Sequence, residues 1–184
     1  MRKVILAYKN FAANRNISHI GLGVSALNTA KVLRREGVPT EVWPILSPVD
    51  LSERLEGSGA THVIISAPWI PTADLHRLCN QYPDTTFAMN CHSNVGFLQA
   101  DANGVRLLRE AMELETGTFN FHVSGNSLKF CRWVKASYGV PCTFLPNLYY
   151  LSENAAPRRP LWRCGVLRIG AFGATRPLKN FISA

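Results

Sequence analysis

Four polar side chains gather where a strongly apolar segment ends. The segment TTFAMNC covers residues 85–91, and Asn90, His92, Ser93 and Asn94 stand at its end, ahead of a predicted helix. An imidazole, which titrates near neutral pH, can hydrogen-bond a hydroxyl or a phosphate oxygen. These residues therefore predict a substrate-binding site, with His92 as its candidate catalytic residue. The alternative is local capping by Ser93 or Asn94, with His92 bonded to the backbone.

A second polar group follows the apolar segment FNFHVS. Ser124 and Asn126 lie in the sequence HVSGNS, at another predicted helix start. Both are candidate substrate-binding residues. Serine and asparagine are also the preferred residues for capping a helix N-terminus, and capping is the reading that we favour here.

The long polar loop after the first apolar segment ends in two glycines, Gly21 and Gly23, where a helix is expected to begin. Glycines let a ligand approach the backbone, and a helix N-terminus favours anions, so a phosphate or sugar contact is one interpretation. A tight turn is the other. The pattern is not a full GxGxxG, because Ala26 stands at the position of the third glycine, and we take this to disfavour a nicotinamide dehydrogenase.

Near the end of the printed sequence, GAFGATRPLKN has the pattern of a strand end, a glycine turn and a helix start. Arg176 and Lys179 lie in this turn, and cations beside a helix N-terminus suit a phosphate group. They are candidate binding residues for a diphosphate.

The elements that would position these residues alternate between strand-like and helix-like segments. Continuous apolar runs indicate strands covered on both faces. This alternation predicts a Rossmann-like α/β fold, a doubly wound, mostly parallel sheet with helices on both faces. The expected strands are KVILAY, EVWPIL, THVIISA, TTFAMNC, FNFHVS and CTFLP, and the expected helices cover residues 23–36, 71–81, 102–115 and 126–138.

Charge is distributed unevenly along the 184 residues. Residues 1–153 hold 14 Lys and Arg against 12 Asp and Glu, whereas residues 154–184 hold six basic residues and no acidic one. A domain that binds duplex nucleic acid more often carries its charge on its body, so we expect no nucleic-acid partner. The five cysteines lack metal-ligand spacing, which predicts free thiols and no metal. A cytoplasmic location is the default, because no signal peptide or membrane span is evident.

These motifs in this order resemble glycosyltransferases of the GT-B fold, family-4 type. GLGVSALNTAKVLRREGVPTEVW resembles their first βαβ unit, and MNCHSN their strand-end histidine segment. SGNSLKFCRWVKASYGVPCTFLPNLYY resembles the segment leading to the interdomain linker, and LRIGAFGATRPLKN the start of the second Rossmann domain. The resemblance covers essentially the whole chain. Two departures are that Ala174 and Thr175 separate the glycine from Arg176, and that asparagine follows Lys179.

The resemblance implies a domain organisation and roles. Residues 1–151 would be the acceptor-side domain, 152–164 a linker, and 165–184 the first strand and loop of a truncated donor-side domain. A nucleotide sugar would be the donor substrate, with its diphosphate held by Arg176 and Lys179 and faced by Gly21 and Gly23. The resemblance implies no further cofactor and no metal. Alone, the 184 residues are predicted to transfer sugar poorly.

Other readings stay open. A non-catalytic Rossmann-like module that binds a nucleotide or sugar fits the same pattern, because no GxSxG, P-loop, HExxH or paired-carboxylate motif is evident. A basic-tailed adaptor for nucleic acid or membranes is a third reading. The unpaired strand near residues 166–172 predicts a homo-oligomer or packing on the linker side of the first domain. Peripheral membrane contact, the acceptor and the stereochemical outcome are left open.

Overall fold

The computed structural model describes residues 2–10, 20–93, 95–98 and 101–150. The chain forms two compact units, Met1–Tyr150 and Leu151–Ala184, and all described residues belong to the first. The predicted linker at 152–164 and the predicted strand and loop at 165–184 thus lie outside the described residues.

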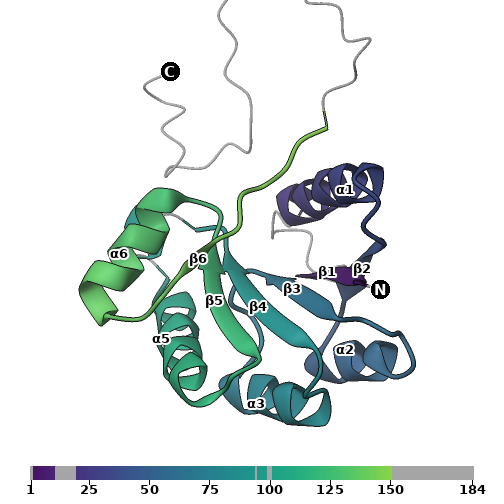
Figure 1. The fold of residues 1–184 in the computed structure, drawn as a ribbon. Helices are drawn as coiled ribbons and strands as arrows, with labels where there is room; N and C mark the ends of the chain where they lie inside the picture. Colours follow the sequence, from purple (N-terminus) through teal and green to yellow (C-terminus); the bar gives the residue numbers. More distant parts are fainter. Residues whose placement is uncertain (1, 11–19, 94, 99–100, 151–184) are drawn as a thin grey trace, which may run out of the picture. The chain divides into compact units, whose positions relative to one another are not determined.

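Six parallel strands form a single sheet in the order β2-β1-β3-β4-β5-β6 (Figure 1). The order reverses direction after β2, as in doubly wound folds. The predicted Rossmann-like α/β class is therefore confirmed. The strands are β1 Val4–Lys9, β2 Thr40–Ile45, β3 His62–Ser66, β4 Thr86–Cys91, β5 Phe121–Gly125 and β6 Thr143–Phe144.

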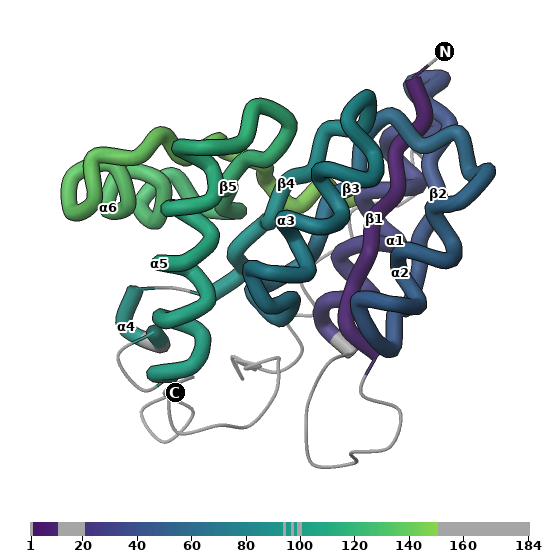
Figure 2. Tube along the Cα trace, turned by 90° about the horizontal axis from the view of Figure 1, so that it is seen from below, coloured from purple at the N-terminus to yellow at the C-terminus, as the bar shows by residue number. Residues whose placement is uncertain are grey.

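Helices lie on both faces of the sheet but are divided unequally. Among the described residues, α1 packs on one face with its own small apolar cluster, while α2, α3, α5 and α6 contribute to the larger core on the other (Figures 1 and 2). The helices are α1 Ile20–Arg35, α2 Pro48–Leu55, α3 Thr72–Gln81, α4 Val95–Leu98, α5 Ala102–Gly117 and α6 Leu128–Tyr138.

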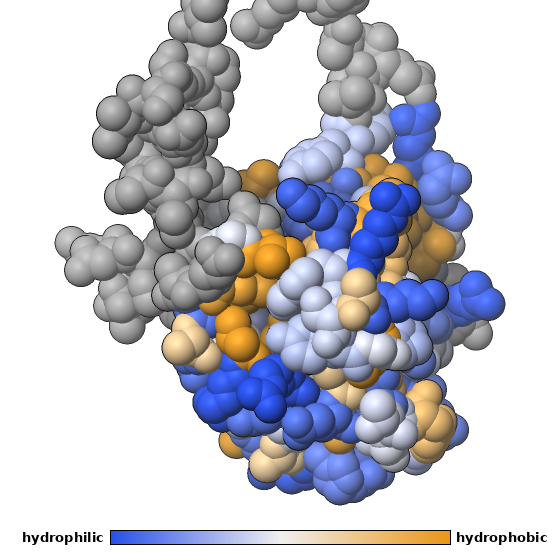
Figure 3. Space-filling model, turned by 90° about the vertical axis from the view of Figure 1, so that its left-hand side faces the viewer, coloured by the Kyte–Doolittle hydropathy of each residue, from blue (hydrophilic) through white to orange (hydrophobic). Residues whose placement is uncertain are grey.

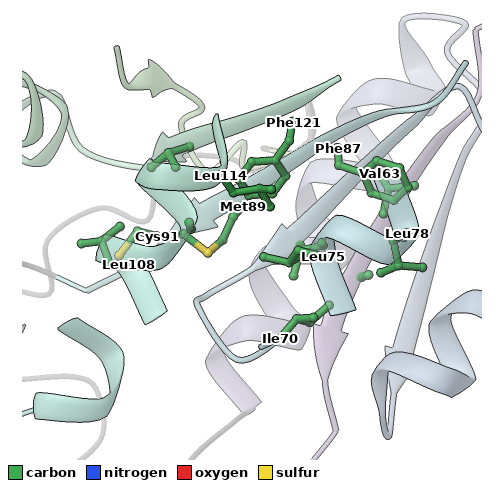
Figure 4. Packing of buried hydrophobic residues seen from close by; sticks show 14 of the residues in the cluster. Val63, Ile70, Leu75, Leu78, Phe87, Met89, Cys91, Leu108, Leu114 and Phe121 are labelled. Atoms are coloured by element: carbon green, nitrogen blue, oxygen red, sulfur yellow. The ribbon is translucent and has the colours of Figure 1, made fainter. Parts of the chain in front are cut away.

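The main core is built from alternate residues of the central strands. Val63, Phe87, Met89 and Phe121 point from the sheet toward the apolar faces of α3 and α5, where Leu75 and similar side chains meet them (Figure 4). Burial of such large apolar side chains is the main favourable term in folding. This core holds the strand ends, and so the candidate site, in a fixed arrangement.

Helix α1 lies close to the sheet because its inner face is made of small residues. Ala26 and Ala30 are buried against Leu6. A Cβ at Gly23 would lie 3.2 Å from Cζ of Tyr8, tighter than an ordinary contact. The helix ends at Arg35, close to the predicted end at residue 36, and the following Gly37 has a φ of +76° that suits glycine.

Two helices were not predicted. In α2, the Ser47 side chain accepts a hydrogen bond from the Asp50 backbone N–H at 3.1 Å, and Pro48 occupies the first turn. Both are strong signals of a helix start. Helix α4 has four residues and too little sequence to show a period. Leu128, the first residue of α6, is 51% exposed.

Exposed apolar side chains are scattered among polar ones. The side of the molecule nearest α6 shows hydrophilic and hydrophobic groups mixed together (Figure 3). Leu128, Tyr138 and Phe144 are among the exposed apolar residues of the described chain. No helix in the described ranges is long and apolar enough to cross a membrane.

Candidate functional site

The carboxyl ends of the central strands meet at one edge of the sheet, where α/β proteins commonly bind ligands. Strand β3 ends at Ser66 and β4 at Cys91, with Ser66 paired in register with Asn90. Ala67, directly after β3, has a φ of 70°, and its N–H donates to the Asn90 carbonyl at 2.8 Å. A non-glycine residue in this conformation is strained, and such strain is found preferentially at functional sites.

A cavity of about 160 Å³ lies between this edge and α1. Its walls come from α1, β1, β3, β4 and the residues after β6. All of the lining residues belong to the described ranges, and none of them carries a formal charge at neutral pH. The lining residues are Leu6, Ser25, Ala26, Thr29, Leu33, Ile64, Ser66, Asn90, His92, Leu145, Pro146, Asn147 and Leu148.

Asn90 is only 6% exposed, and the two ends of its amide have different environments. The Nδ2 group donates to the Leu145 carbonyl at 3.2 Å. The buried Oδ1 atom has no hydrogen-bond partner among the described residues. A buried acceptor without a partner costs free energy, so it is a natural contact for a ligand that donates a hydrogen bond.

His92 is half-buried and holds a second unpartnered atom. Its Nδ1 lies 3.5 Å from Nδ2 of Asn126, at the long limit of a hydrogen bond, and its buried Nε2 has no hydrogen-bond partner among the described residues. Burial lowers the pKa of the His92 imidazole, because it disfavours the charged form. At neutral pH the ring is therefore uncharged and acts through hydrogen bonds.

We call residues 145–148 the post-β6 segment; they form one wall of the cavity. The Leu145 N–H donates to the Gly125 carbonyl at 3.0 Å, and the Leu148 N–H donates to Oγ1 of Thr29 at 3.2 Å. With the bond from Asn90, these contacts attach the segment to β5, β4 and α1. Beyond it, Arg35 of α1 lies over the Tyr150 ring at 5.4 Å.

The structure brings together only some of the predicted site residues. Asn90 and His92 line the cavity, and Asn126, which is not among the lining residues, contacts His92. Ser124 is fully buried and donates through Oγ to the Met89 carbonyl at 3.0 Å, so its hydroxyl is already used. Ser93 is half-buried outside the cavity lining.

Three further predicted residues, Asn94, Arg176 and Lys179, lie outside the described residues.

Gly21 and Gly23 lie in the first turn of α1 rather than in a loop before it. A Cβ at Gly23 would lie close to Tyr8, whereas a Cβ at Gly21 would contact no atom of the described residues within 4 Å. Gly23 therefore has a packing role that is independent of any ligand. Neither glycine lines the cavity.

Lys9 is a cationic residue at the end of β1, and its ammonium is already engaged. Its ammonium donates to the Leu46 carbonyl and lies 5.1 Å from the centroid of the Trp69 ring.

Helix capping was the role favoured for the polar residues at the start of α6. Ser127 does occupy the cap position, but its side chain makes no capping hydrogen bond.

Within the described ranges, no group of three or more His, Cys, Asp or Glu side chains is arranged to hold a metal ion. Cys79, Cys91 and Cys131 are buried free thiols, and burial raises the pKa of Cys91 to about 11. Buried thiols in this state are poor nucleophiles.

Sequence reasoning missed the contribution of α1 and of the post-β6 segment. Ser25 and Thr29 are spaced i, i+4 beside the inner Ala26 and Ala30, which places small hydroxyl groups next to the packed stripe. The i, i+4 spacing of these two hydroxyl residues is the feature of the sequence that could have indicated a contribution of α1 to the cavity. Nothing local in the sequence indicates that Leu148 would bond to Thr29.

The chain matches no protein-family model, no curated protein sequence and no solved structure. A functional assignment therefore depends on the cavity and its residues.

Proposed function

We propose that this chain is the acceptor-side, N-terminal part of a glycosyltransferase that moves a sugar from a nucleotide-sugar donor to an acceptor hydroxyl. The observation that carries this proposal is the uncharged cavity at the carboxyl edge of the sheet, with unpartnered atoms on Asn90 and His92. Such a site favours an uncharged hydroxyl group over a phosphate, because no cation lines it to balance a negative charge.

In the proposed reaction, His92 and Asn90 orient the acceptor hydroxyl. The acceptor oxygen bonds to the anomeric carbon of the sugar, and the bond from that carbon to the diphosphate breaks. The nucleoside diphosphate leaves with the bonding electrons, and the hydroxyl proton is released to the diphosphate or to water. The role of these two side chains is to position the reacting oxygen, which can lower the barrier substantially.

On the donor side, Arg176 and Lys179 are proposed to hold the diphosphate as its negative charge grows. Gly21 and Gly23 are proposed to face the donor from the start of α1, whose N–H groups favour an anion. The open space around Gly21 is compatible with this role. A nucleotide sugar is the substrate, and no metal is invoked.

The test determines the coding sequence around these 184 residues and uses the whole protein that it encodes. We expect a second Rossmann half to follow, and the whole protein to release nucleoside diphosphate from a nucleotide sugar only when an acceptor is present. Arg176→Ala and Lys179→Ala should each reduce donor binding at least tenfold and leave acceptor binding intact. Normal transfer by both variants would contradict the diphosphate assignment.

A non-catalytic binding module is the second candidate, favoured by the absence of any carboxylate among the cavity-lining residues. It predicts the same binding of hydroxyl ligands and nucleotide. It also predicts that no glycoside product is detected by mass spectrometry, with any donor, in the complete protein.

A further inference from the structure

The cavity walls are mainly apolar, and this limits the ligands that fit. Leu6, Ile64 and Leu145 are among the apolar residues, which slightly outnumber the uncharged polar ones. The larger apolar side chains come from four separate elements, so they surround the ligand rather than forming one side. An uncharged ligand with a hydrocarbon body is the chemistry that such walls favour.

Besides the side chains of Ser25, Thr29, Ser66 and Asn147, the cavity lining offers one acceptor and one donor that have no partner among the described residues, on Asn90 and His92. Because Nδ2 of Asn90 is held by the Leu145 carbonyl, its Oδ1 is left as an acceptor. Nδ2 of Asn126 faces Nδ1 of His92 at 3.5 Å, so we assign Nδ1 as the acceptor and the proton of the neutral ring to Nε2. A hydroxyl group can donate to an acceptor such as Oδ1 and accept from a donor such as Nε2–H, so the chemistry of a hydroxyl suits both unpartnered atoms.

Volume and polarity together distinguish a simple alcohol from a sugar. An apolar cavity of about 150 Å³ holds one benzene molecule, and this one, which is partly open, has a volume of about 160 Å³. A pyranose of similar size would bring several hydroxyls against Leu6, Ile64 and Leu145. Each hydroxyl left without a partner would weaken binding by about tenfold or more.

Resting on the proposed function, we infer that the cavity binds the acceptor, and that the acceptor presents an uncharged six-membered ring with a single hydroxyl, a phenol or a cyclic alcohol. The ring lies against Leu6, Ile64 and Leu145. Its hydroxyl lies between Asn90 and His92, at the edge of the sheet. This binding requires neither donor nor transfer.

The test is an NMR titration of the methyl-labelled 184-residue chain with phenol, cyclohexanol, benzene and methyl α-glucoside. We expect phenol and cyclohexanol to shift the Ile64 and Leu145 methyl signals in a saturable manner. Benzene, which lacks the hydroxyl, should bind about tenfold more weakly, and the glucoside should leave the signals unchanged.

His92→Phe keeps an aromatic ring and removes both nitrogens. It should abolish the advantage of phenol over benzene without preventing benzene from binding. His76→Phe makes the same change at an exposed position of α3 and should leave the advantage intact. Unchanged methyl spectra in the absence of ligand confirm that each variant is folded.

Equal affinities for phenol and benzene, or preferred binding of the glucoside, would overturn the inference. Its failure can be separated from failure of the proposed function. Phenol binding without sugar transfer by the complete protein counts against the glycosyltransferase alone, and transfer to an acceptor without phenol binding counts against the ring alcohol alone.

Discussion

Asn90 and Leu145 are joined by a 3.2 Å hydrogen bond from the Asn90 amide to the Leu145 carbonyl, although they are 55 positions apart in the sequence. The oxygen of the same amide has no hydrogen-bond partner in the part of the chain that the structure describes, and this side chain lines the cavity. One buried side chain therefore both holds a wall of the cavity and offers a binding atom. This double role makes Asn90 the most informative position for mutation.

Asn90→Asp is nearly identical in shape but removes the donor and places a carboxylate beside the Leu145 carbonyl. We expect the free energy of unfolding to fall by about 1–3 kcal/mol at pH 7, because a buried donor is lost and two acceptors face each other. Urea unfolding measures the change. Asn103→Asp, on the exposed side of α5, is the control, and an equal loss in both variants would contradict the role assigned to Asn90.

Ser124→Ala tests whether this predicted substrate-binding residue is structural. The Ser124 hydroxyl is fully buried and bonded to the Met89 carbonyl. We expect the free energy of unfolding to fall by about 0.5–1.5 kcal/mol, with phenol affinity unchanged within twofold. Loss of phenol binding with full stability would show that the hydroxyl contacts the ligand instead.

Gly125→Ala should destabilise the fold because the end of β5 has no room for a methyl group. An added Cβ would lie 2.4 Å from Cδ1 of Phe130. We expect a loss of about 1–3 kcal/mol in the free energy of unfolding, as for other overpacked sites. Gly21→Ala, where the added Cβ meets nothing within 4 Å, should instead raise stability by about 0.5 kcal/mol. Chemical denaturation that ranked the two variants in the opposite order would refute this packing argument.

Stability should fall as the pH is lowered from 7.5 to 5.5, because burial lowers the pKa of His92. The unfolded chain, whose imidazole has the ordinary pKa of about 6.5, then binds the proton more readily than the folded one. Protons therefore favour unfolding below that pH, and stability is fully present above it. Urea unfolding across this range should show a smaller pH-dependent loss in His92→Gln than in the wild type.

His76→Gln, at an exposed position, is the control and should keep the wild-type dependence of stability on pH. If stability depended on pH identically in His92→Gln and the wild type, His92 would not be the titrating group.

Glu115 acts in the opposite direction at lower pH. Burial raises the pKa of its carboxyl group, so its contribution to stability is lost as the pH rises from about 4.5 through that raised value.

The sheet was predictable because its strands are short continuous apolar runs separated by helices. Even Pro44, which weakens the pattern of β2, fits the fold, since β2 is an edge strand where proline is tolerated. Helix α2 was missed although Ser47 and Pro48 mark its start and the buried Leu51 and Leu55 are spaced i, i+4.

The site residues were predictable only where they lie at the end of a strand or directly after it. Asn90 and His92 were found because strand ends converge at one edge of a parallel sheet. Ser124 has the same sequence position relative to β5, yet it points into the sheet and bonds to β4. Whether a strand-end hydroxyl faces solvent or a neighbouring backbone depends on register, which local sequence does not determine.

The bond between Thr29 and Leu148 spans 119 positions, and it has a consequence for biosynthesis. Contacts between residues so distant in sequence form late, because a long loop must first be closed. During synthesis from the N-terminus, α1 and the first strands leave the ribosome long before residue 148. The cavity is therefore among the last features of this unit to be completed, and a nascent chain that stops before β6 would have a nearly complete sheet without a binding site.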